Sequence, residues 1–309
     1  MRPDGLEAAR EAALLDPLGA EAALGHGLAL KAAARIAEAI GELQRALRLD
    51  PELAEARLAL GEAWLEAGEP DRALQALERL EPDERVLGAM ARARAIKDRA
   101  RSDPGYVRHL FDQFAQTYEA TMTGALAYAA PKDLRRLYDF FPRGRAGLDI
   151  LDLGCGTGLC GAAFRDLARR LDGVDLSPAM IAHARRRGIY DSLAVDDIET
   201  YLSREGPDYD LILAADAFVY LGDLAPVFSG AARRMKKGGA LIFTVERLEG
   251  QGFELGPKRR WRHSEDYLRR TAAEEGLDPI GIVSCTPRYE ANAPVDGLAI
   301  ALTHLTGQP

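Results

Sequence analysis

Two patterns of hydrophobic and polar positions divide the chain. Over the first hundred residues, apolar positions recur at helical spacing among Ala, Leu, Glu and Arg, and β-branched residues are few. That pattern favours helix throughout. From Leu148 onward, short apolar runs alternate with amphipathic stretches, which is typical of a mainly parallel sheet covered on both faces. The sequence therefore predicts an all-α part followed by an α/β part.

Seven apolar runs predict the strands of the α/β part. Helices are expected between them at about 159–170, 178–187, 224–236 and 264–276. Only a loop around Pro287–Pro294 separates the last two strands, so they are expected to pair antiparallel at one edge. The predicted sheet is therefore seven-stranded and mixed. Its strands are LDILDLG, LDGVD, SLAV, YDLILAA, ALIFTVE, PIGIVSC and GLAIALTHL.

The helical part contains an internal repeat of 34 residues. This period, with small residues where helices meet, resembles the tetratricopeptide repeat (TPR). In the better copy, from Ala54 to about Pro82, Gly68 makes the turn; in the earlier copy Ala34 replaces that glycine. A generic alanine-rich bundle is the alternative. The repeat pairs Pro17 with Pro51, Gly27 with Gly61, Ala39 with Ala73, and Leu43 with Leu77.

About two and a half repeats are visible, fewer than the three or more that a solenoid usually needs to bury its faces. We therefore expect this module to pack on the other domain or on a second chain, and to recruit a protein partner or form a homodimer. The predicted organisation is a TPR-like domain at 1–102, a linker with lid helices at 103–147, and an α/β domain at 148–309. Tyr106 to about Leu126 is expected to be mostly helical, with a further helix from Pro131 to about Phe141.

Charge and composition exclude several classes of protein. Forty basic and forty-eight acidic residues give a net charge of −8, which argues against nucleic acid as a partner. Charged residues interrupt every apolar segment, and acids stand among the first residues, so neither a membrane helix nor a signal peptide is expected. The three cysteines show no zinc-like spacing. We predict a cytoplasmic protein without a metal, a membrane partner or a nucleic-acid partner.

The strongest local signal is the glycine-rich stretch Leu151–Gly158, between the first strand and the first helix of the α/β part. Glycines there allow a sharp turn and a close approach to a ligand. In open α/β sheets, ligands bind beyond the carboxyl ends of the strands at the switch point. A dinucleotide fingerprint would require a third glycine where Leu159 stands, and no P-loop lysine comes after it. The pattern present is an acid two residues before G-x-G-x-G.

The segment D-L-G-C-G-T-G at 152–158 resembles motif I of the class I S-adenosylmethionine-dependent methyltransferases. Four later segments match the family in order: GVDLSPAM at 173–180, DDI at 196–198, YDLILAAD at 209–216 and KGGAL at 237–241. The segments on either side of these motifs, at 106–119, 260–267 and 294–297, together with the repeats, resemble a group of methyltransferases that carry N-terminal TPRs. The resemblance implies a Rossmann-like class I fold, S-adenosylmethionine as cofactor and S-adenosylhomocysteine as product.

The resemblance also implies roles for individual residues. Asp175 would bind both ribose hydroxyls, because a carboxylate offers several lone pairs to a diol. Asp197 would accept from the adenine amino group, and Tyr118 on the lid would cover the cofactor. The predicted cofactor-binding residues are Tyr118, Asp152, Gly154, Cys155, Gly156, Gly158, Asp175, Leu176, Met180, Asp197, Ile198, Asp216 and Phe218, the last two near the sulfonium.

Catalytic residues are harder to predict. His263 is the best candidate for a general base, because its unperturbed pKa lies near neutrality. The alternative is an ordinary surface histidine before a helix capped by Ser264. Tyr220 is a candidate for the acceptor pocket, although an aromatic residue there often serves packing. Cys155 and Cys160 are expected to be packing residues, not nucleophiles, since neither has a basic neighbour in sequence.

The residues just after the fourth strand narrow the class of acceptor. Asp216–Val219 reads D-A-F-V, which lacks the pair of prolines typical of enzymes that methylate base amino groups. The basic run Lys258–Arg262 either holds an anionic substrate or is a solvated loop. We expect methylation of an O or N acceptor on a small or carrier-bound metabolite. The alternatives are a SAM-sensing scaffold, a protein methyltransferase and, disfavoured by Leu159, an NAD or nucleotide-sugar enzyme.

Overall fold

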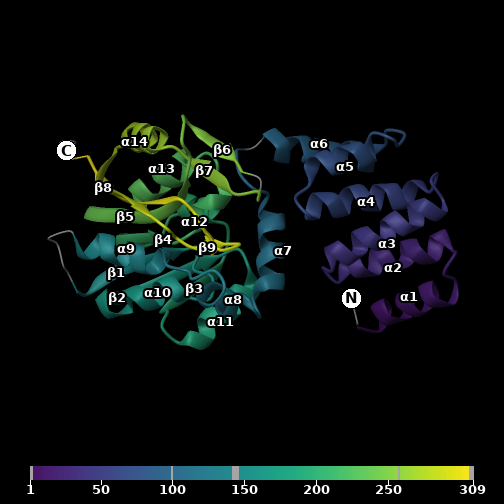
Figure 1. Ribbon diagram of the computed structural model, residues 1–309, viewed down its shortest axis with the longest axis horizontal. Helices are drawn as coiled ribbons and strands as arrows, with labels where there is room; N and C mark the ends of the chain where they lie inside the picture. The colour runs from purple at the N-terminus through teal and green to yellow at the C-terminus, as the bar shows by residue number, and fades with distance from the viewer. Residues whose placement is uncertain (1–2, 99, 141–145, 257, 306–309) are drawn as a thin grey trace. The chain divides into compact units, whose positions relative to one another are not determined.

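A computed structural model describes residues 3–98, 100–140, 146–256 and 258–305 (Figure 1). The chain divides into two compact units, Met1–His109 and Leu110–Pro309. The border falls inside helix α7 (Pro104–Phe114), a few residues beyond the predicted boundary after residue 102. We refer to the two as the helical unit and the α/β unit.

The helical unit consists of helices that pack in succession around two small cores of Ala, Leu and Ile side chains. The predicted second helix of the better repeat copy begins at Pro70, where a missing backbone N–H costs nothing. The helices are α1 (Pro3–Leu15), α2 (Ala20–Ala32), α3 (Ile36–Leu49), α4 (Ala54–Glu66), α5 (Pro70–Leu77) and α6 (Glu84–Asp98).

The repeat of 34 residues is visible as a repeated contact. A Cβ atom at Gly27 would lie 2.8 Å from Leu43 Cγ, and one at Gly61 would lie 2.7 Å from Leu77 Cγ. Both leucines are fully buried. Glycine therefore lets the two helices of each pair approach closely, at equivalent positions of both copies.

The α/β unit is built on a sheet with the strand order β3-β2-β1-β4-β5-β11-β8. Strands β1 to β5 pair in parallel, whereas β11 pairs antiparallel with both β5 and β8. This confirms the predicted mixed sheet and the antiparallel last pair at its edge. The seven strands are β1 (Leu148–Leu153), β2 (Ala168–Asp175), β3 (Ser192–Val195), β4 (Tyr209–Ala214), β5 (Met235–Arg247), β8 (Leu277–Cys285) and β11 (Gly297–His304).

Helices cover both faces of the sheet, as Figure 1 shows for α9 and α10 on one side and α13 and α14 on the other. The second face also carries α12, which the sequence pattern did not predict. The helices are α9 (Ala130–Asp139), α10 (Leu159–Phe164), α11 (Pro178–Arg187), α12 (Ile198–Ser203), α13 (Ala225–Arg234) and α14 (Glu265–Glu274).

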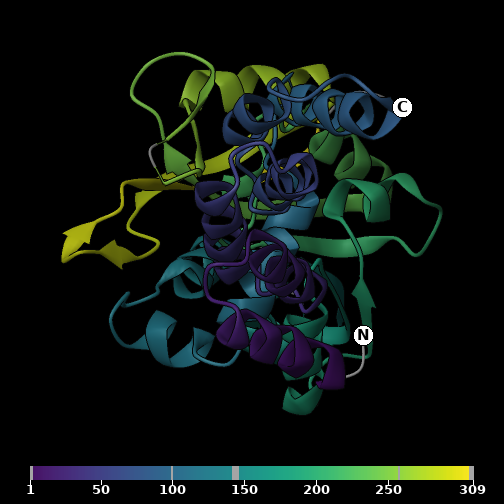
Figure 2. The same cartoon turned by 90° about the vertical axis from the view of Figure 1, so that its right-hand side faces the viewer.

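Several boundaries differ from the prediction. The helix expected over 159–170 ends at Phe164, because a 3₁₀ turn (Arg165–Leu167) leads directly into β2. The lid region is two helices, α7 and α8 (Tyr118–Thr123). Short strands β6 (Phe253–Leu255) and β7 (Trp261–His263) extend the sheet beside β5. The hairpin of β9 (Tyr289–Glu290) and β10 (Ala293–Pro294) extends outward in Figure 2, in yellow.

Candidate active site

The glycine-rich loop lies where the order of the sheet reverses. Strand β1 pairs with β2 on one side and β4 on the other, so its carboxyl end opens at the switch point. Gly154, Gly156 and Gly158 have φ angles of +64°, +55° and +93°. A Cβ atom at Gly154 would lie 2.6 Å from the Cβ of Ala217, just beyond β4. Glycine is therefore required both for the turn and for the close approach of two strand ends.

Asp175 joins the end of β2 to this loop. One carboxylate oxygen accepts from the Gly156 amide at 2.9 Å, and the other accepts from the Ser177 amide at 2.8 Å. Burial raises the pKa of Asp175 to about 6, although the two amide donors oppose that rise. The structure therefore brings together Asp175 and the loop, as the sequence predicts.

Asp152 lies beneath the loop at the end of β1 and is fully buried. Its Oδ2 accepts a hydrogen bond from the Tyr190 hydroxyl at 2.6 Å, while its Oδ1 has no partner among the described residues. Burial raises the pKa of Asp152 to about 7, and the nearby Asp175 adds to the rise. An unpaired buried carboxylate oxygen beside a second acid is a place where a cationic ligand would be stabilised.

Tyr118, at the start of α8, lies over the loop. Its hydroxyl is 3.9 Å from the position that a Cβ atom at Gly156 would occupy. Phe111 and Phe114 of α7 contact its ring edge-on, with centroids 6.3 and 5.4 Å away. Burial raises the pKa of Tyr118 far above its ordinary value, and the charges of Asp216 and Asp175 add to this. Tyr118 is therefore a neutral phenol over the glycine loop.

Two polar contacts fasten the lid to the start and end of α11. Asp112 of α7 accepts from the Ser177 hydroxyl at 2.5 Å and from the Ala179 amide at 3.2 Å. Glu119 of α8 pairs with Arg187 at 2.5 Å. The two lid helices are thus hydrogen-bonded to both ends of α11.

The predicted adenine end lies beside α12. Asp197 caps this helix, since its Oδ1 accepts from the Thr200 amide at 3.1 Å. The Cδ1 of Ile198 is 3.8 Å from the Cβ position of Gly154. Ile198 therefore lies at the loop, and the cap explains why this turn is helical. The contacts of Asp197 and Ile198 with adenine stay predictions, as does that of Leu176, which is half-buried after Asp175.

Three other predicted cofactor residues lie in hydrophobic cores. Met180 and Phe218 are fully buried, and Phe218 packs against Phe243 with ring centroids 5.0 Å apart. Cys155 packs against α11, and burial raises the pKa of its thiol well above the ordinary value. Cys160, on α10, lies in another core cluster, and burial likewise raises the pKa of its thiol well above the ordinary value. Both cysteines are therefore neutral packing residues, as expected, and the cofactor contacts of Met180 and Phe218 gain no support from their positions.

His263 is a core residue and not a surface residue. It is fully buried, its Nε2 lies 3.0 Å from the Gly222 carbonyl oxygen, and its ring stacks on Tyr267 with centroids 5.8 Å apart. Burial lowers its pKa to about 4, so the imidazole is neutral near pH 7. The alternative prediction of an ordinary surface histidine is therefore wrong. The buried position also favours a packing role for His263 over the predicted role as general base. Tyr220 lies at the lid instead, with its ring 5.5 Å from that of Phe111.

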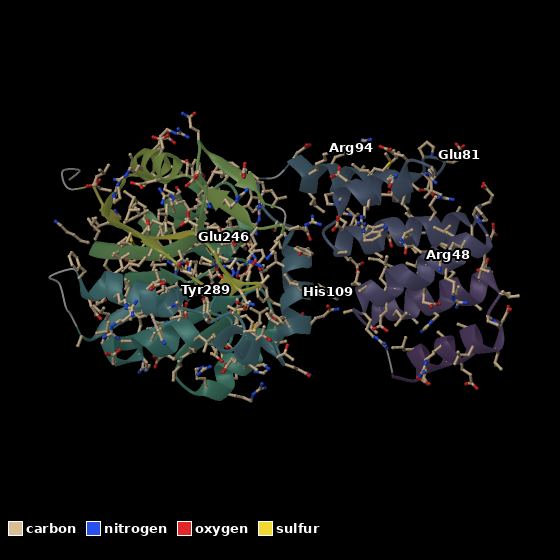
Figure 3. The ribbon with its side chains drawn as sticks, in the orientation of Figure 1. Arg48, Glu81, Arg94, His109, Glu246 and Tyr289 are labelled. Carbon is tan, nitrogen blue, oxygen red and sulfur yellow. The ribbon has the colours of Figure 1, made fainter. Side chains whose placement is uncertain are left out.

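Sequence reasoning missed a cluster of charges at the ends of β4 and β5. Arg288, in the loop before β9, is 2% exposed and pairs with Asp216, Glu246 and Glu290. Glu246, labelled in Figure 3, is the penultimate residue of β5. No motif signals Arg288, because its partners are separated from it in sequence by up to 72 residues.

A mostly parallel sheet with this strand order, and a glycine loop flanked by two acids, define the class I methyltransferase architecture. Residues 150–239 match the family model described as a methyltransferase domain. Residues 30–96 match the model described as a tetratricopeptide repeat. The chain therefore contains an S-adenosylmethionine-dependent methyltransferase domain after a tetratricopeptide repeat region, and S-adenosylmethionine is the cofactor of that domain.

Curated relatives resemble part of the chain. A ubiquinone biosynthesis O-methyltransferase of Xanthomonas oryzae is 27% identical over 114 residues, 36% of this chain and 48% of the relative. A malonyl-[acyl-carrier protein] O-methyltransferase of Yersinia pestis is 30% identical over 128 residues, 40% of this chain and 46% of the relative. A ribosomal protein L11 methyltransferase of Aeromonas hydrophila is 34% identical over 129 residues, which are 38% of this chain and 44% of the relative. The chain thus spans about half the length of these relatives.

Solved structures confirm the fold. A SAM-dependent methyltransferase of Leishmania major has a TM-score of 0.54 at 17% identity, covering 68% of this chain and 89% of its own. The [4+2]-cyclase SpnF has a TM-score of 0.55 at 16% identity, covering 68% and 99%. A cyclase with this fold illustrates that the fold alone does not determine the reaction.

The residues present fit S-adenosylmethionine. The cofactor carries positive charge, and the unpaired Oδ1 of buried Asp152 is a group that positive charge would stabilise. Among the described residues, no group of three or more His, Cys, Asp or Glu side chains has the arrangement of a metal site. None of the described helices combines the length and the apolar character needed to cross a bilayer.

Proposed function

We propose that the chain transfers a methyl group from S-adenosylmethionine to an oxygen or nitrogen acceptor on a small or carrier-bound metabolite, and that the tetratricopeptide region recruits a protein partner or forms a homodimer. The observation that carries the proposal is the position of Asp175, hydrogen-bonded to the Gly156 amide beside the buried Asp152. Each carboxylate oxygen of Asp175 can accept more than one hydrogen bond, so the two hydroxyls of a ribose diol can donate to this side chain.

Each residue of the site has a distinct part in this proposal. Asp152 and Asp175 hold the cofactor, which supplies an activated methyl group when it is bound. Tyr118 covers the loop and excludes water, while Tyr220 forms a wall for the acceptor. Holding the acceptor in line with the methyl group accounts for much of the rate of such displacements.

The relatives support a small acceptor. Two of the three are described as O-methyltransferases, one of ubiquinone biosynthesis and one of a malonyl-acyl carrier. Protein methylation is a second candidate, because a third relative is described as a ribosomal protein methyltransferase. Transfer of labelled methyl groups to a protein fraction, and not to a metabolite fraction, would favour the second candidate.

The proposal is tested by calorimetric titration with S-adenosylmethionine and with NAD. Replacing Asp175 by Ala removes the acceptors for two hydroxyl hydrogen bonds. The binding free energy of S-adenosylmethionine should therefore become less favourable by about 2–4 kcal/mol. Asp266→Ala is the matched control, because Asp266 is an exposed acid paired with Arg270 on α14. Unchanged affinity in Asp175→Ala, or tighter binding of NAD by the native chain, would contradict the proposal. Cofactor binding without turnover on any metabolite or protein pool would favour the SAM-sensing scaffold.

A further inference from the structure

One aromatic ring occupies the space that three glycines leave beneath the glycine-rich loop. The ring belongs to Tyr190, which lies between α11 and β3. A Cβ atom at Gly158, on the loop, would lie 2.9 Å from its Cε2 atom, and one at Gly173, on β2, would lie 2.9 Å from its Cε1 atom. A Cβ atom at Gly161, on α10, would lie 2.6 Å from its Cζ atom. Any larger residue at these positions would displace the ring, so the loop, α10 and β2 together fix where it lies.

The backbone beside Tyr190 is fixed as well. Asp191, the next residue, donates its amide to the Leu171 carbonyl oxygen at 2.8 Å, and its side chain accepts from the Leu171 amide at 2.8 Å. Leu171 is a fully buried residue of β2. Because both the backbone and the ring are held, the hydroxyl group of Tyr190 is held too, at 2.6 Å from Oδ2 of Asp152.

This hydrogen bond orients the acid at the end of β1. Asp152 is fully buried, and with Oδ2 engaged its carboxylate cannot turn without losing a buried hydrogen bond. Its other oxygen, Oδ1, has no hydrogen-bond partner among the described residues. The engaged oxygen thus determines the direction of the unpaired one, which is the oxygen available to a ligand.

The other titratable groups that face Asp152 do not stabilise its charge. One of them is a second acid, and burial keeps the rest, two thiols and a phenol, neutral. The ionised form of Asp152 is favoured first by the Tyr190 hydroxyl and then by the Gly161 backbone amide. Among the side chains that the structure describes around this acid, Tyr190 is therefore the one that stabilises its charge. The other groups are Asp175 on β2, Cys155 in the loop, Cys160 on α10 and Tyr128 before α9.

We propose that Tyr190 is a positioning residue for the cofactor: it holds Asp152 by Oδ2 and so presents Oδ1, ionised, to the positive charge of S-adenosylmethionine. The inference rests on the proposed function, in which Asp152 holds the cofactor. It also gives three glycines a shared purpose, because Gly158, Gly161 and Gly173 make room for the ring that carries the hydroxyl group. No sequence motif singles out Tyr190, since it lies 38 residues from the acid to which it donates.

The dependence of cofactor affinity on pH should reveal this role. Burial raises the pKa of Asp152 to about 7, and the hydrogen bond from Tyr190 opposes the rise. Removal of the hydroxyl group takes away that opposition, so the pKa of Asp152 rises further and the acid stays protonated at higher pH. A protonated Asp152 has no charge with which to stabilise a cationic ligand, so the affinity should fall most near neutral pH.

The test measures binding of S-adenosylmethionine by calorimetry between about pH 5.5 and about pH 8.5, in the native full chain and in Tyr190→Phe, which keeps the ring. At about pH 7 the affinity of the variant should be lower by about tenfold, and the midpoint of its pH dependence should move upward by about one pH unit. An unchanged affinity at this pH, or a loss of the same size at every pH, would overturn the proposal. Failure of the native chain to bind S-adenosylmethionine would instead contradict the proposed function.

Tyr209→Phe is the matched control. Tyr209 is a buried tyrosine that also donates to a buried aspartate, Asp172, at 2.9 Å, but it begins β4, at the opposite end of the strand from the site. Both substitutions keep the ring and remove one hydrogen bond to an acid, so they should cost similar stability. The control should leave the affinity and its pH dependence unchanged, and a loss as large as that in Tyr190→Phe would overturn the proposal.

A double-mutant cycle then tests whether Tyr190 acts through Asp152. In the Asp152→Asn background the charge is already absent, so adding Tyr190→Phe should lower the affinity for S-adenosylmethionine by less than about threefold. Equal losses in the native and Asp152→Asn backgrounds would show that Tyr190 acts on the cofactor independently of this acid, and would overturn the proposal.

Discussion

At the scale of single residues, two buried acids dominate the electrostatics of the site. Burial raises the pKa of Asp152 to about 7 and that of Asp175 to about 6. The ligand-free folded state therefore holds protons that the unfolded chain releases near pH 4. The resulting stabilisation is complete below the unfolded pKa and is lost as pH rises through 6 to 7.

We therefore predict that the ligand-free chain is more stable at about pH 5 than at about pH 8, by on the order of 4 kcal/mol from these two groups. Urea unfolding of the native chain and of Asp152→Asn at both pH values measures the difference. The variant cannot ionise at this position, so its stability should change less. The prediction would be contradicted if the free energy of unfolding of the native chain rose from about pH 5 to about pH 8, or if it fell by no more than that of the variant.

Cofactor affinity should show the opposite dependence on pH. A cationic ligand pairs with ionised acids, so affinity for S-adenosylmethionine should increase about tenfold as pH rises through the pKa of Asp152. In Asp152→Asn the affinity should be lower and should depend less on pH over the same range, because only Asp175, with a pKa of about 6, then titrates there. Calorimetry at several pH values measures both, and a parallel dependence in variant and native chain would exclude Asp152 as the group responsible.

The residues of the site differ in how far sequence could predict them. Asp152, Asp175 and the loop glycines stand at fixed positions after β1 and β2, so a motif could identify them. Arg288 could not be identified, because its role depends on side chains from β4, β5 and β9 that meet only in the folded sheet. The burial of His263 could not be predicted either, because it depends on the short strands β6 and β7, and no periodic hydrophobic pattern predicts these strands.

At the scale of elements, the two repeat copies differ at one turn in a way that can be measured. Gly68 has φ +68°, and its counterpart Ala34 has φ +59°. A left-handed alanine is strained by roughly 1 kcal/mol, so Ala34→Gly should stabilise the chain by up to about that amount. Unfolding in urea gives the change, and a loss of stability would show that the turn is not strained.

The reciprocal substitution should have the opposite effect. A Cβ atom at Gly68 would lie 2.5 Å from Cγ of Tyr106, in addition to the left-handed backbone. Gly68→Ala should therefore destabilise the chain by about 1–3 kcal/mol. Gly25→Ala is a suitable control, since a Cβ atom there meets nothing within 4 Å and the position is helical. A smaller loss in Gly68→Ala than in the control would contradict this account.

Element positions were predicted best where apolar runs are long and buried. Strands β1 and β4 lie within a residue of their predicted bounds, because nearly every position in them is buried. Strand β5 begins at Met235 instead of Ala240, since its first residues pair with β4 across an irregular register. Pairing of this kind is set by a neighbouring strand and leaves no hydrophobic pattern.

At the scale of the whole molecule, the alternation of apolar runs was enough to predict an α/β unit after a helical one. The strand order could not be predicted from periodicity, because periodicity does not state which strands are neighbours; it came from the structure. Cofactor binding then connects the local site to the stability of the fold. A ligand that binds only the folded state stabilises it by about 2.7 kcal/mol when its concentration is 100 times its Kd.

We predict that S-adenosylhomocysteine raises the free energy of unfolding of the α/β unit by about this amount, and that Asp175→Ala loses the increment at the same ligand concentration. Ala34→Gly is the matched control, because it changes a turn of the helical unit and leaves every residue of the site in place. It should raise stability without ligand and retain the full ligand-induced increment. An increment that persists in Asp175→Ala would mean that the ligand binds elsewhere, since the end of β2 would then contribute nothing to its affinity.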